Sequence, residues 1–318
     1  MLKIFIDGHA GTTGLQIHER LQNRGEIQLL SIPDQDRKNK AVKKKLFSEA
    51  DLIILCLPDH AAIASVELAG NTRILDASTA YRTHQDWIYG LPELDPGQRD
   101  LITNARLVSN PGCYPTGFLL AIAPLIALGQ LRPDVQLSIS AVSGYTGGGR
   151  QLIEKFQSAN VREGRWSSRP YALKFGHKHV PEMKKYAGLS EAPLFMPSVG
   201  NYPQGMLVSI PLTQSFFEAN TSLDDIYSLL SERYSDEPCV LVHQPNSNDH
   251  LTDGFLDPQD NNNTNRNDIH IFGNDEQFML VSQLDNLGKG AAGAAIQNLN
   301  IMLGINELDG LHVEMMNR

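Results

Sequence analysis

Residues 2–78 alternate between short apolar runs and longer segments in which apolar positions recur with helical spacing. The apolar runs LKIFID, EIQLLSI, DLIILCL and TRILDAS predict four strands, and the segments between them predict helices. Strands that are apolar throughout are typical of a parallel sheet covered by helices on both faces. Because crossovers between parallel strands are right-handed, this pattern predicts a doubly wound, Rossmann-like domain.

From about Val135 the pattern changes. The segments VQLSISAVSG, MLVSIPLTQ, CVLVHQ, DIHIFG and FMLVSQLD predict strands of a second, more antiparallel sheet. The Asn-rich stretch 257–268 lies among them and predicts an exposed loop. We therefore predict an α/β protein with a Rossmann-like doubly wound parallel sheet and a second α+β domain with a mostly antiparallel sheet.

Three further segments complete the expected organisation. Residues 81–105 are polar and predict irregular structure. The run TGFLLAIAPLIALG predicts a helix that is kinked or broken at Pro124, because proline lacks the N–H group and crowds the preceding turn. The run KGAAGAAIQNLNIMLG predicts a helix whose small side chains let it pack closely against another backbone.

Composition and charge narrow the function classes. The chain has 318 residues, of which 41% are hydrophobic and 20% charged, as in soluble globular proteins of two domains. Its formal net charge of −9 argues against a nucleic-acid partner. The N-terminus has no signal-peptide pattern and the longest apolar run is too short to cross a bilayer, so no membrane is expected. Three widely spaced cysteines argue against a disulfide framework and favour the reducing cytoplasm.

A glycine loop follows the first predicted strand. Gly8, Gly11 and Gly14 are spaced three apart at the start of a helix, where glycines allow the backbone to approach a phosphate closely. Thr12 and Thr13 add hydroxyl donors. An ordinary strand-to-helix turn is the alternative, but the position after the first strand favours a dinucleotide site.

The end of the second strand bears on which dinucleotide binds. NAD-binding domains usually carry an acidic residue there, on the ribose hydroxyls. Here Ser31 is followed by the basic pair Arg37 and Lys38, which suits a 2′-phosphate and favours NADP. The acids Asp34 and Asp36 keep NAD open.

Cys113 stands between a predicted strand and a predicted helix, in SNPGCYPT. Gly112 allows a sharp turn, and Pro115 suits the first turn of a helix. A helix N-terminus stabilises the thiolate, which is the nucleophilic form of cysteine. A small buried residue in a rigid turn is the alternative for Cys113, and it is the interpretation we give to Cys56 and Cys239.

A histidine pair offers acid–base chemistry. His177 and His179 lie two apart in FGHKHVPEM, so in an extended segment their side chains face the same way. Either imidazole can serve as general acid or base, with Glu182 orienting it. Surface or core histidines remain an alternative, and a metal site is not expected because no further ligand cluster completes it.

Two more glycine-rich segments are candidates for binding. SGYTGGGR (143–150) follows an alternating strand, and its backbone donors, hydroxyls and Arg150 can hold a phosphate or a carboxylate. A flexible loop is the equally favoured alternative. DNLGKGAAG (285–293) forms a second strand–glycine–helix junction that can return the chain to the cofactor domain.

The motifs GHAGTTG, SNPGCYPT, SGYTGGGR, GHKHVPE and DNLGKGAAGAAIQNLN, in this order, resemble those of the N-acetyl-gamma-glutamyl-phosphate reductase family of arginine biosynthesis, in its shorter type. The resemblance spans residue 8 to about 304. It implies NADPH-dependent reductive dephosphorylation of N-acetyl-L-glutamyl 5-phosphate to N-acetyl-L-glutamate 5-semialdehyde, through a thioester on Cys113. It also implies an acid–base histidine at His177 or His179, with His177 slightly favoured. An aspartate-semialdehyde dehydrogenase and a non-catalytic NADP-sensing protein remain as alternatives.

The expected domains are residues 1–115 for NADP(H) binding, completed by the C-terminal helix at about 287–318, and residues 116–286 for catalysis, substrate binding and dimerisation. Inorganic phosphate and a homo-oligomer, dimer or tetramer, are the further expectations. The expected cofactor-binding residues are Gly8, Gly11, Thr12, Thr13, Gly14, Ser31, Arg37, Lys38, Pro58, Ser78, Asn286, Gly288 and Lys289. The expected substrate-binding residues are Asn110, Ser143, Gly144, Tyr145, Arg150 and Glu182.

Overall fold

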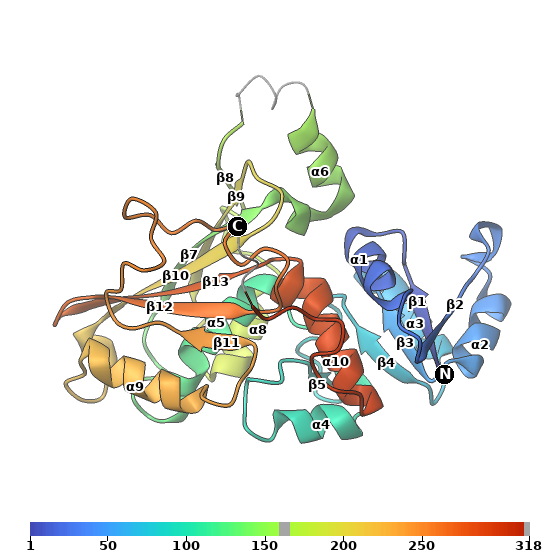
Figure 1. The fold of residues 1–318 in the computed structure, drawn as a ribbon, viewed down its shortest axis with the longest axis horizontal. Coiled ribbons are helices and arrows are strands. Elements are labelled where there is room, and N and C mark those ends of the chain that lie inside the picture. The colour runs from blue at the N-terminus through green and yellow to red at the C-terminus, as the bar shows by residue number, and fades with distance from the viewer. Residues whose placement is uncertain (159–165, 315–318) are drawn as a thin grey trace. The chain divides into compact units, whose positions relative to one another are not determined.

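The computed structural model describes residues 1–158 and 166–314 (Figure 1). The chain divides into two compact units. Unit 1 comprises Met1–Pro111 and Ala291–Leu311, and unit 2 comprises Gly112–Gly290 and His312–Arg318. The domain limits expected from the sequence lie a few residues from these, and the roles assigned to the domains stay a prediction at this point.

Unit 1 is built on one six-stranded sheet. Its strands are β1 (Leu2–Asp7), β2 (Ile27–Leu30), β3 (Leu52–Leu55), β4 (Arg73–Asp76), β5 (Ile88–Tyr89) and β6 (Leu107–Ser109), in the order β2-β1-β3-β4-β6-β5. All five pairings are parallel, which confirms the predicted sheet. The strand order reverses between β1 and β3, and ligands of such sheets bind beyond the carboxyl ends of the strands at this switch point.

The helices of unit 1 are α1 (Thr12–Leu21), α2 (Lys40–Glu49), α3 (Asp59–Leu68), α4 (Gln98–Asn104) and α10 (Gly293–Leu303), with a 3₁₀ turn at Asp34–Asp36. The expectation of irregular structure over 81–105 is wrong in part, because this stretch contains β5 and α4. Both elements are too short for their periodicity to be recognised, since α4 buries only Gln98 and Ile102.

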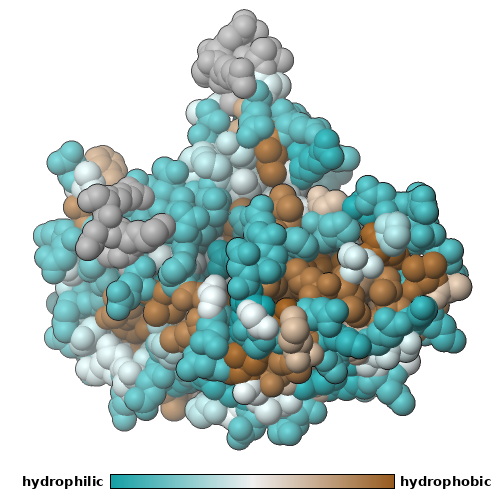
Figure 2. Space-filling view, turned by 45° about the vertical axis from the view of Figure 1, so that its right-hand side comes forward, coloured by the Kyte–Doolittle hydropathy of each residue, from teal (hydrophilic) through white to brown (hydrophobic). Residues whose placement is uncertain are grey.

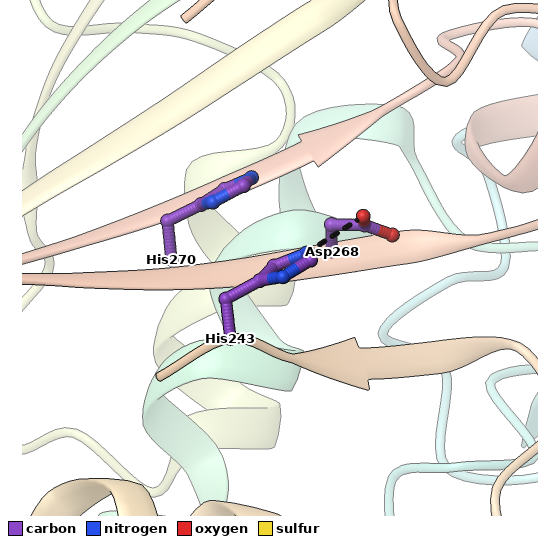
Figure 3. Close-up of side chains that lie close together, drawn as sticks. All are labelled: His243, Asp268 and His270. Atoms are coloured by element: carbon purple, nitrogen blue, oxygen red, sulfur yellow. Dashed lines mark hydrogen bonds and ion pairs between the residues drawn. The ribbon is translucent and has the colours of Figure 1, made fainter. Parts of the chain in front are cut away.

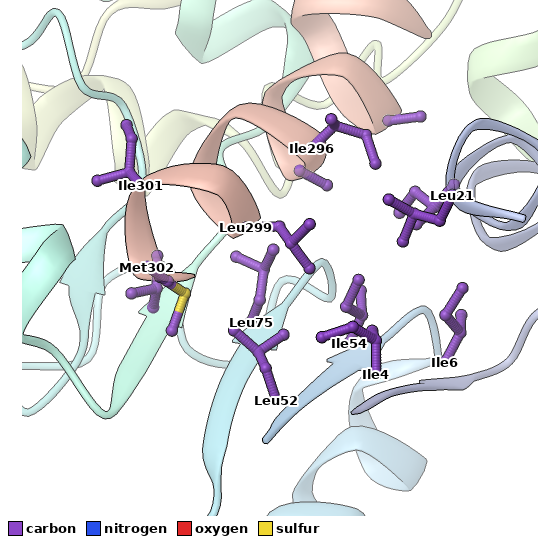
Figure 4. Packing of buried hydrophobic residues seen from close by; sticks show 14 of the residues in the cluster. Ile4, Ile6, Leu21, Leu52, Ile54, Leu75, Ile296, Leu299, Ile301 and Met302 are labelled. Carbon is purple, nitrogen blue, oxygen red and sulfur yellow. The ribbon is translucent and has the colours of Figure 1, made fainter. Parts of the chain in front are cut away.

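The C-terminal helix α10, drawn red, lies with the blue strands of unit 1 (Figure 1). Figure 4 shows Ile296 and Leu299 of α10 above Ile4, Ile54 and Leu75 of the strands, and all five side chains are buried. Full burial of one such side chain contributes about 1.5–3 kcal/mol. The last helix is therefore part of the core of unit 1 although it begins 184 residues after the end of β6 (293 − 109).

Unit 2 is built on a seven-stranded sheet. Its strands are β7 (Ser138–Gly144), β8 (Arg169–Pro170), β9 (Leu194–Gly200), β10 (Met206–Thr213), β11 (Val240–Val242), β12 (Asn267–Gly273) and β13 (Gln277–Leu284), in the order β11-β12-β13-β10-β7-β9-β8. Four pairings are antiparallel, whereas β11–β12 and β7–β9 are parallel. The predicted mostly antiparallel second sheet is confirmed.

The helices of unit 2 are α5 (Cys113–Ala127), α6 (Gly149–Gln157), α8 (Val180–Ala187) and α9 (Leu223–Arg233), with 3₁₀ turns at Tyr145–Gly148 and Gln214–Phe216. A π-helical turn, Gly288–Ala292, leads from β13 toward α10. The helix α5 packs on one face of the sheet, where the hydroxyl of Ser282 donates to the carbonyl of Gly117 at 2.7 Å.

The helix α5 continues through Pro124 to Ala127, so the predicted break is wrong. Proline removes the N–H group that would bond the carbonyl of Leu120, four residues earlier. The hydroxyl of Tyr234 replaces it and donates to the Leu120 carbonyl at 2.7 Å. A residue 114 positions away thus satisfies the carbonyl that proline leaves, and no local pattern indicates this.

The Asn-rich stretch 257–268 is a loop, but the expectation that it is exposed is wrong. Asn261, Thr264 and Asn265 are fully buried. The Asn261 amide donates to the carbonyl of Gln283 at 2.8 Å, and the Thr264 hydroxyl donates to the Asn261 carbonyl at 2.8 Å. The amide and hydroxyl groups serve the loop's own backbone and the neighbouring strand, so their polarity does not direct them to solvent.

Hydrophilic side chains cover much of the face drawn in Figure 2, with groups of apolar side chains between them. Within residues 1–158 and 166–314, no helix is both long and apolar enough to cross a membrane. In unit 2, the strand register turns Leu194, Met196 and Leu241 to the sheet face opposite α5, where they are 40–48% exposed. That sheet face therefore presents apolar side chains to solvent.

Candidate active site

The helix α5 begins at Cys113, as the sequence predicts. Gly112 is extended (φ −77°, ψ 149°) and its carbonyl accepts the N–H group of Thr116 at 2.9 Å, which closes the first helical turn. Cys113 is half-buried, and all three cysteines, which lie within the described residues, are thiols and not disulfides. Unpaired N–H groups at a helix N-terminus favour a nearby negative charge, so the position suits a thiolate.

Gly290 lies directly against Cys113. A Cβ atom at position 290 would lie 2.7 Å from the Cβ of Cys113, closer than side chains approach one another. The N–H group of Gly290 donates to the carbonyl of Asp285 at 2.9 Å, which holds the turn after β13 in place. Sequence reasoning missed Gly290, although it stands in the glycine-rich junction after the last strand.

Glu182 binds the backbone of the cysteine turn. Its carboxylate accepts the N–H group of Gly112 at 3.0 Å, and its side chain is 1% exposed. The residue comes from the first turn of α8. The sequence placed Glu182 with the substrate or with a histidine, whereas the structure places one of its oxygens on the N–H group of Gly112, the residue before Cys113.

The two histidines lie side by side, with ring centroids 4.7 Å apart. The expected extended segment is wrong, because His179 is in the helical region (φ −86°, ψ −15°) and caps α8. The backbone N–H of His179 donates to Nδ1 of His177 at 3.2 Å. Neutral His177 therefore carries its proton on Nε2, which lies 3.4 Å from the hydroxyl of Tyr171.

Aromatic side chains surround this pair. The rings of His177 and His179 each lie 5.9 Å from the ring of Tyr114, the residue after Cys113. Phe195 of β9 packs on Tyr114 at 5.0 Å, and the hydroxyl of Tyr171 donates to that of Tyr114 at 3.3 Å. Sequence reasoning missed Tyr114 and Tyr171. The position of Tyr114 inside SNPGCYPT was a signal that could have indicated it, whereas Tyr171 lies in no motif.

Burial sets the protonation of this cluster. Burial, and secondarily the charge of Lys178, lower the pKa of His177 to about 4. Burial raises the pKa of Tyr171 to about 12 and that of Tyr114 well above its usual range. At neutral pH the three side chains are therefore uncharged, and Nε2 of His177 has a proton to donate.

The loop SGYTGGGR is held by residues distant in sequence. A Cβ atom on Gly144 would overlap the carbonyl of Pro203. The Asn286 amide donates to the hydroxyl of Thr146 at 3.1 Å, and its oxygen accepts the N–H of Gly205 at 2.9 Å. Asn286, expected at the cofactor, lies in unit 2 and orders this loop.

The other expected substrate residues are spread over both units. Ser143 is buried at the end of β7, and Tyr145 starts the 3₁₀ turn that follows. The side chain of Arg150 is 87% exposed and pairs with Glu154 at 2.8 Å along α6. In unit 1, the Asn110 amide donates to the carbonyl of Ala291 at 3.0 Å.

The glycine loop of unit 1 has the shape of a phosphate cradle. Gly8 has φ +93°, and a Cβ atom there would overlap the carbonyl of Cys56. A Cβ atom on Gly14 would overlap the carbonyl of Gly8. Gly11 precedes α1, whose first turn contains Thr12 and Thr13. Both close approaches require glycine, and they leave the N-terminus of α1 beyond the switch point of the sheet.

A buried ion pair anchors the strand that enters this loop. The carboxylate of Asp7, the last residue of β1, lies 2.5 Å from Nζ of Lys43 and accepts the hydroxyl of Ser65 at 2.9 Å. Lys43 comes from α2 and Ser65 from α3. Three elements are thus joined directly below the glycine loop.

The basic residues expected at the ribose lie after β2. Ser31 and Lys38 are exposed. The guanidinium of Arg37 lies 2.9 Å from Nε2 of His9, inside the glycine loop, and pairs with Asp34 at 2.7 Å. The structure therefore brings Arg37 to the glycine loop, and it adds His9, which sequence reasoning missed.

Two family models match most of the chain. The model described as "Semialdehyde dehydrogenase, NAD binding domain" matches residues 3–102, and "Semialdehyde dehydrogenase, dimerisation domain" matches residues 113–286. The N-acetyl-gamma-glutamyl-phosphate reductase 2 of Nostoc sp. is 51% identical, covering 97% of this chain and 99% of the relative. The N-acetyl-gamma-glutamyl-phosphate reductase of Brucella ovis is 45% identical, covering 95% and 99%. The chain belongs to the N-acetyl-gamma-glutamyl-phosphate reductase family. This confirms the resemblance, and with it an oxidoreductase that uses NADP(H).

Solved structures share the fold of this family member at low identity. The aspartate semialdehyde dehydrogenase of Francisella tularensis has a TM-score of 0.72 at 17% identity, covering 95% of this chain and all of the other. The aspartate semialdehyde dehydrogenase II of Vibrio cholerae has a TM-score of 0.71 at 14% identity, covering 96% and 98%. These likenesses confirm the predicted fold class, and at this identity they say nothing of the substrate.

The remaining expected cofactor residues of this family member belong to unit 1 and to unit 2. Pro58 and Ser78 follow β3 and β4, at the same sheet edge as the glycine loop. The Ser78 hydroxyl donates to Asp76 at 2.6 Å, and burial raises the pKa of Asp76 to about 6. Gly288 and the fully buried Lys289 belong to unit 2, in the π-helical turn.

A second titratable cluster lies in unit 2, away from the cysteine turn in sequence (Figure 3). His243, Asp268 and His270 are buried, with ligand atoms within 4.8 Å of one another. However, Arg266 holds both oxygens of Asp268, at 2.5 and 2.9 Å, and the rings of His243 and His270 stack at 4.4 Å. Parallel rings cannot aim two lone pairs at one ion, and the guanidinium cancels the carboxylate charge, so the arrangement does not suit a metal.

Proposed function

We propose that this protein catalyses the NADPH-dependent reductive dephosphorylation of N-acetyl-L-glutamyl 5-phosphate to N-acetyl-L-glutamate 5-semialdehyde. The observation that carries the proposal is Cys113 at the N-terminus of α5, in the same unit as the histidine pair. Membership of the reductase family supports the substrate, and its relatives carry that name.

The reaction proceeds through a thioester on Cys113. The thiolate attacks the acyl carbon, the bond to the phosphate oxygen breaks, and inorganic phosphate leaves with the electron pair. NADPH, when bound, supplies the hydride that reduces the acyl carbon. The thiohemiacetal then collapses to the aldehyde, and the carbon–sulfur bond returns its electrons to Cys113.

The histidine pair supplies the general acid–base group. We assign the acid–base role to His177, whose Nδ1 is occupied by the N–H of His179. Nε2 is then the atom that gives a proton to the developing oxyanion and takes it back on collapse. The backbone N–H groups at the start of α5 stabilise the same oxyanion.

Unit 1 holds the cofactor in this proposal. The glycine loop binds the diphosphate, because its two close backbone approaches leave room only for glycine. Arg37, beside the loop, and the exposed Lys38 and Ser31 bind the 2′-phosphate, which distinguishes NADPH from NADH. Pro58 and Ser78, at the same sheet edge, are further expected cofactor residues of unit 1. Asn286, Gly288 and Lys289, in the turn after β13, are the cofactor residues expected from unit 2.

In this proposal the loop SGYTGGGR binds the phosphate or the carboxylate of the substrate. Ser143, Gly144, Tyr145 and Asn110 remain the expected substrate residues, although the N–H groups of Gly144 and Tyr145 already donate to the carbonyls of Gly205 and Tyr202, at 2.9 and 3.0 Å. Arg150 reaches the phosphate or the carboxylate by leaving its exposed pair with Glu154. An exposed ion pair contributes only about 0–1 kcal/mol, so the exchange costs little.

A homo-oligomer is part of the proposal. The sheet face of unit 2 opposite α5 exposes Leu194, Met196 and Leu241, and a second copy would cover them. The match of residues 113–286 to a dimerisation domain supports this surface. We place the enzyme in the cytoplasm, because the mechanism requires Cys113 as a thiol.

One assay tests the function. Phosphate-dependent oxidation is measured with N-acetyl-L-glutamate 5-semialdehyde and with aspartate semialdehyde, using NADP⁺ and NAD⁺ in turn. We expect the acetylated substrate with NADP⁺ to give the highest kcat/KM. Faster turnover of the aspartate compound would contradict the proposed substrate, and binding of NADPH without turnover of either would indicate a sensor.

A further inference from the structure

A buried carboxylate beside the nucleophile needs an explanation. The side chain of Glu182 is 1% exposed, and its carboxylate accepts the N–H group of Gly112, 70 residues earlier, at 3.0 Å. Burying a carboxylate is costly unless it is hydrogen-bonded or paired. The N–H group it binds belongs to the residue directly before Cys113.

We propose that Glu182 is a positioning residue: it clamps the turn that carries Cys113 and sets the pH at which the thiol ionises. The inference rests on the proposed function, in which Cys113 is the nucleophile. It differs from the sequence-based expectation that Glu182 contacts the substrate or orients a histidine.

The clamp acts on the direction of the thiol. Gly112 is extended and leads directly into α5, so the position of the Pro111–Gly112 peptide, which carries the Gly112 N–H group, affects where the Cα–Cβ bond of Cys113 points. Glu182 holds that peptide from one side, and Gly290 approaches Cys113 so closely that only glycine fits. Misplacing a reacting atom by about 1 Å can lower a rate about 100-fold.

The charge of Glu182 has a separate effect. A neutral acceptor would fix the Gly112 peptide equally well. The negative charge of Glu182, hydrogen-bonded to the residue before Cys113, disfavours the thiolate of Cys113. The N-terminus of α5 favours that thiolate. Glu182 thus moderates the ionisation that the helix promotes.

The variants Glu182→Gln and Glu182→Ala separate the two effects. The first readout is the pH dependence of Cys113 alkylation by iodoacetamide without substrate, measured by peptide mass so that Cys56 and Cys239 are distinguished. The second is kcat and KM at a fixed pH. Glu232→Gln, on the exposed side of α9, is the matched control.

We expect Glu182→Gln to keep the acceptor and lose the charge. Its alkylation midpoint falls by about 0.5–1 pH unit, and kcat stays within about threefold of the parent protein. Glu182→Ala loses the acceptor as well, so kcat falls about 10- to 100-fold while KM changes less than about threefold. The control changes neither readout.

An unchanged alkylation midpoint in Glu182→Gln would overturn the inference, as would activity lost only in proportion to unfolded protein. Failure of the proposed function would be seen differently. A Cys113→Ser variant would then keep the kcat of the parent protein, independently of any substitution at Glu182. If Glu182→Ala does not fold, the midpoint of Glu182→Gln still decides.

Discussion

The two helix N-termini to which we assign the chemistry are alike locally and differ in what shapes them. Both α1 and α5 follow an extended glycine, Gly11 and Gly112, and neither of these two described helices has a side-chain cap. The turn before α1 is shaped by glycines within six residues of one another. The turn before α5 is shaped by Glu182 and Gly290, far away in sequence.

The two turns meet different physical requirements. A phosphate cradle needs room for the ligand, so its requirements are steric and lie in consecutive residues. A nucleophile needs a fixed direction, and rigid packing against other elements supplies it. Breaking one turn should therefore spare the other, and the predictions below run from the largest expected effect to the smallest.

Cys113→Ser should abolish turnover and spare the glycine loop. We expect kcat to fall at least about 1,000-fold, because a hydroxyl is a far weaker nucleophile than a thiolate. The Kd for NADPH, measured by fluorescence titration, should change less than about twofold. Loss of NADPH binding in step with activity would show that the two turns are not independent.

Gly8→Ala should disrupt the glycine loop and leave the turn before α5 intact. A Cβ atom at φ +93° overlaps the carbonyl of Cys56, so the loop must shift, and the Kd for NADPH should rise about 10- to 100-fold. Alkylation of Cys113 should proceed at the parent rate. Gly25→Ala, where a Cβ atom meets open space, serves as the control; equal effects of the two would refute the cradle.

Arg37→Ala sharpens the cofactor side of the comparison. We expect the Kd for NADPH to rise about tenfold, the loss of one charged phosphate contact, while that for NADH changes less than about twofold. Lys45→Ala, exposed on α2, is the control. A similar loss for both cofactors would place Arg37 on the diphosphate and not on the 2′-phosphate.

The histidine cluster of Figure 3 should make the stability of the protein depend on pH without affecting the turn before α1 or the turn before α5. Burial first, then the charge of His243, lowers the pKa of His270 to about 4, below the value of about 6.5 in the unfolded chain. Between these values the unfolded chain binds more protons, so stability falls as the pH drops from about 6.5 to 4. His270→Asn should reduce the loss of Tm between pH 7 and 5 in thermal scans. An unchanged loss would contradict the assignment.

Much of the architecture was predictable from the sequence, because it depends on local patterns. Apolar strands separated by helices indicated the parallel sheet of unit 1, and alternation indicated the second sheet. The exceptions have physical causes. Tyr234 satisfies the carbonyl that Pro124 leaves, and Asn261 binds the neighbouring strand, so neither the intact helix α5 nor the buried Asn-rich loop follows from local sequence.

The sequence alone determined the family and the residue types of the proposed chemistry: the glycine spacing, the thiol at a helix start and the histidine pair. Only the tertiary structure decided which partners hold them. Arg37 reaches His9 in the glycine loop, and His179 fixes the tautomer of His177. Glu182 binds the N–H group of Gly112, the residue before Cys113, across 70 residues. Such contacts join distant elements, and their geometry exists only after the sheets and helices have packed.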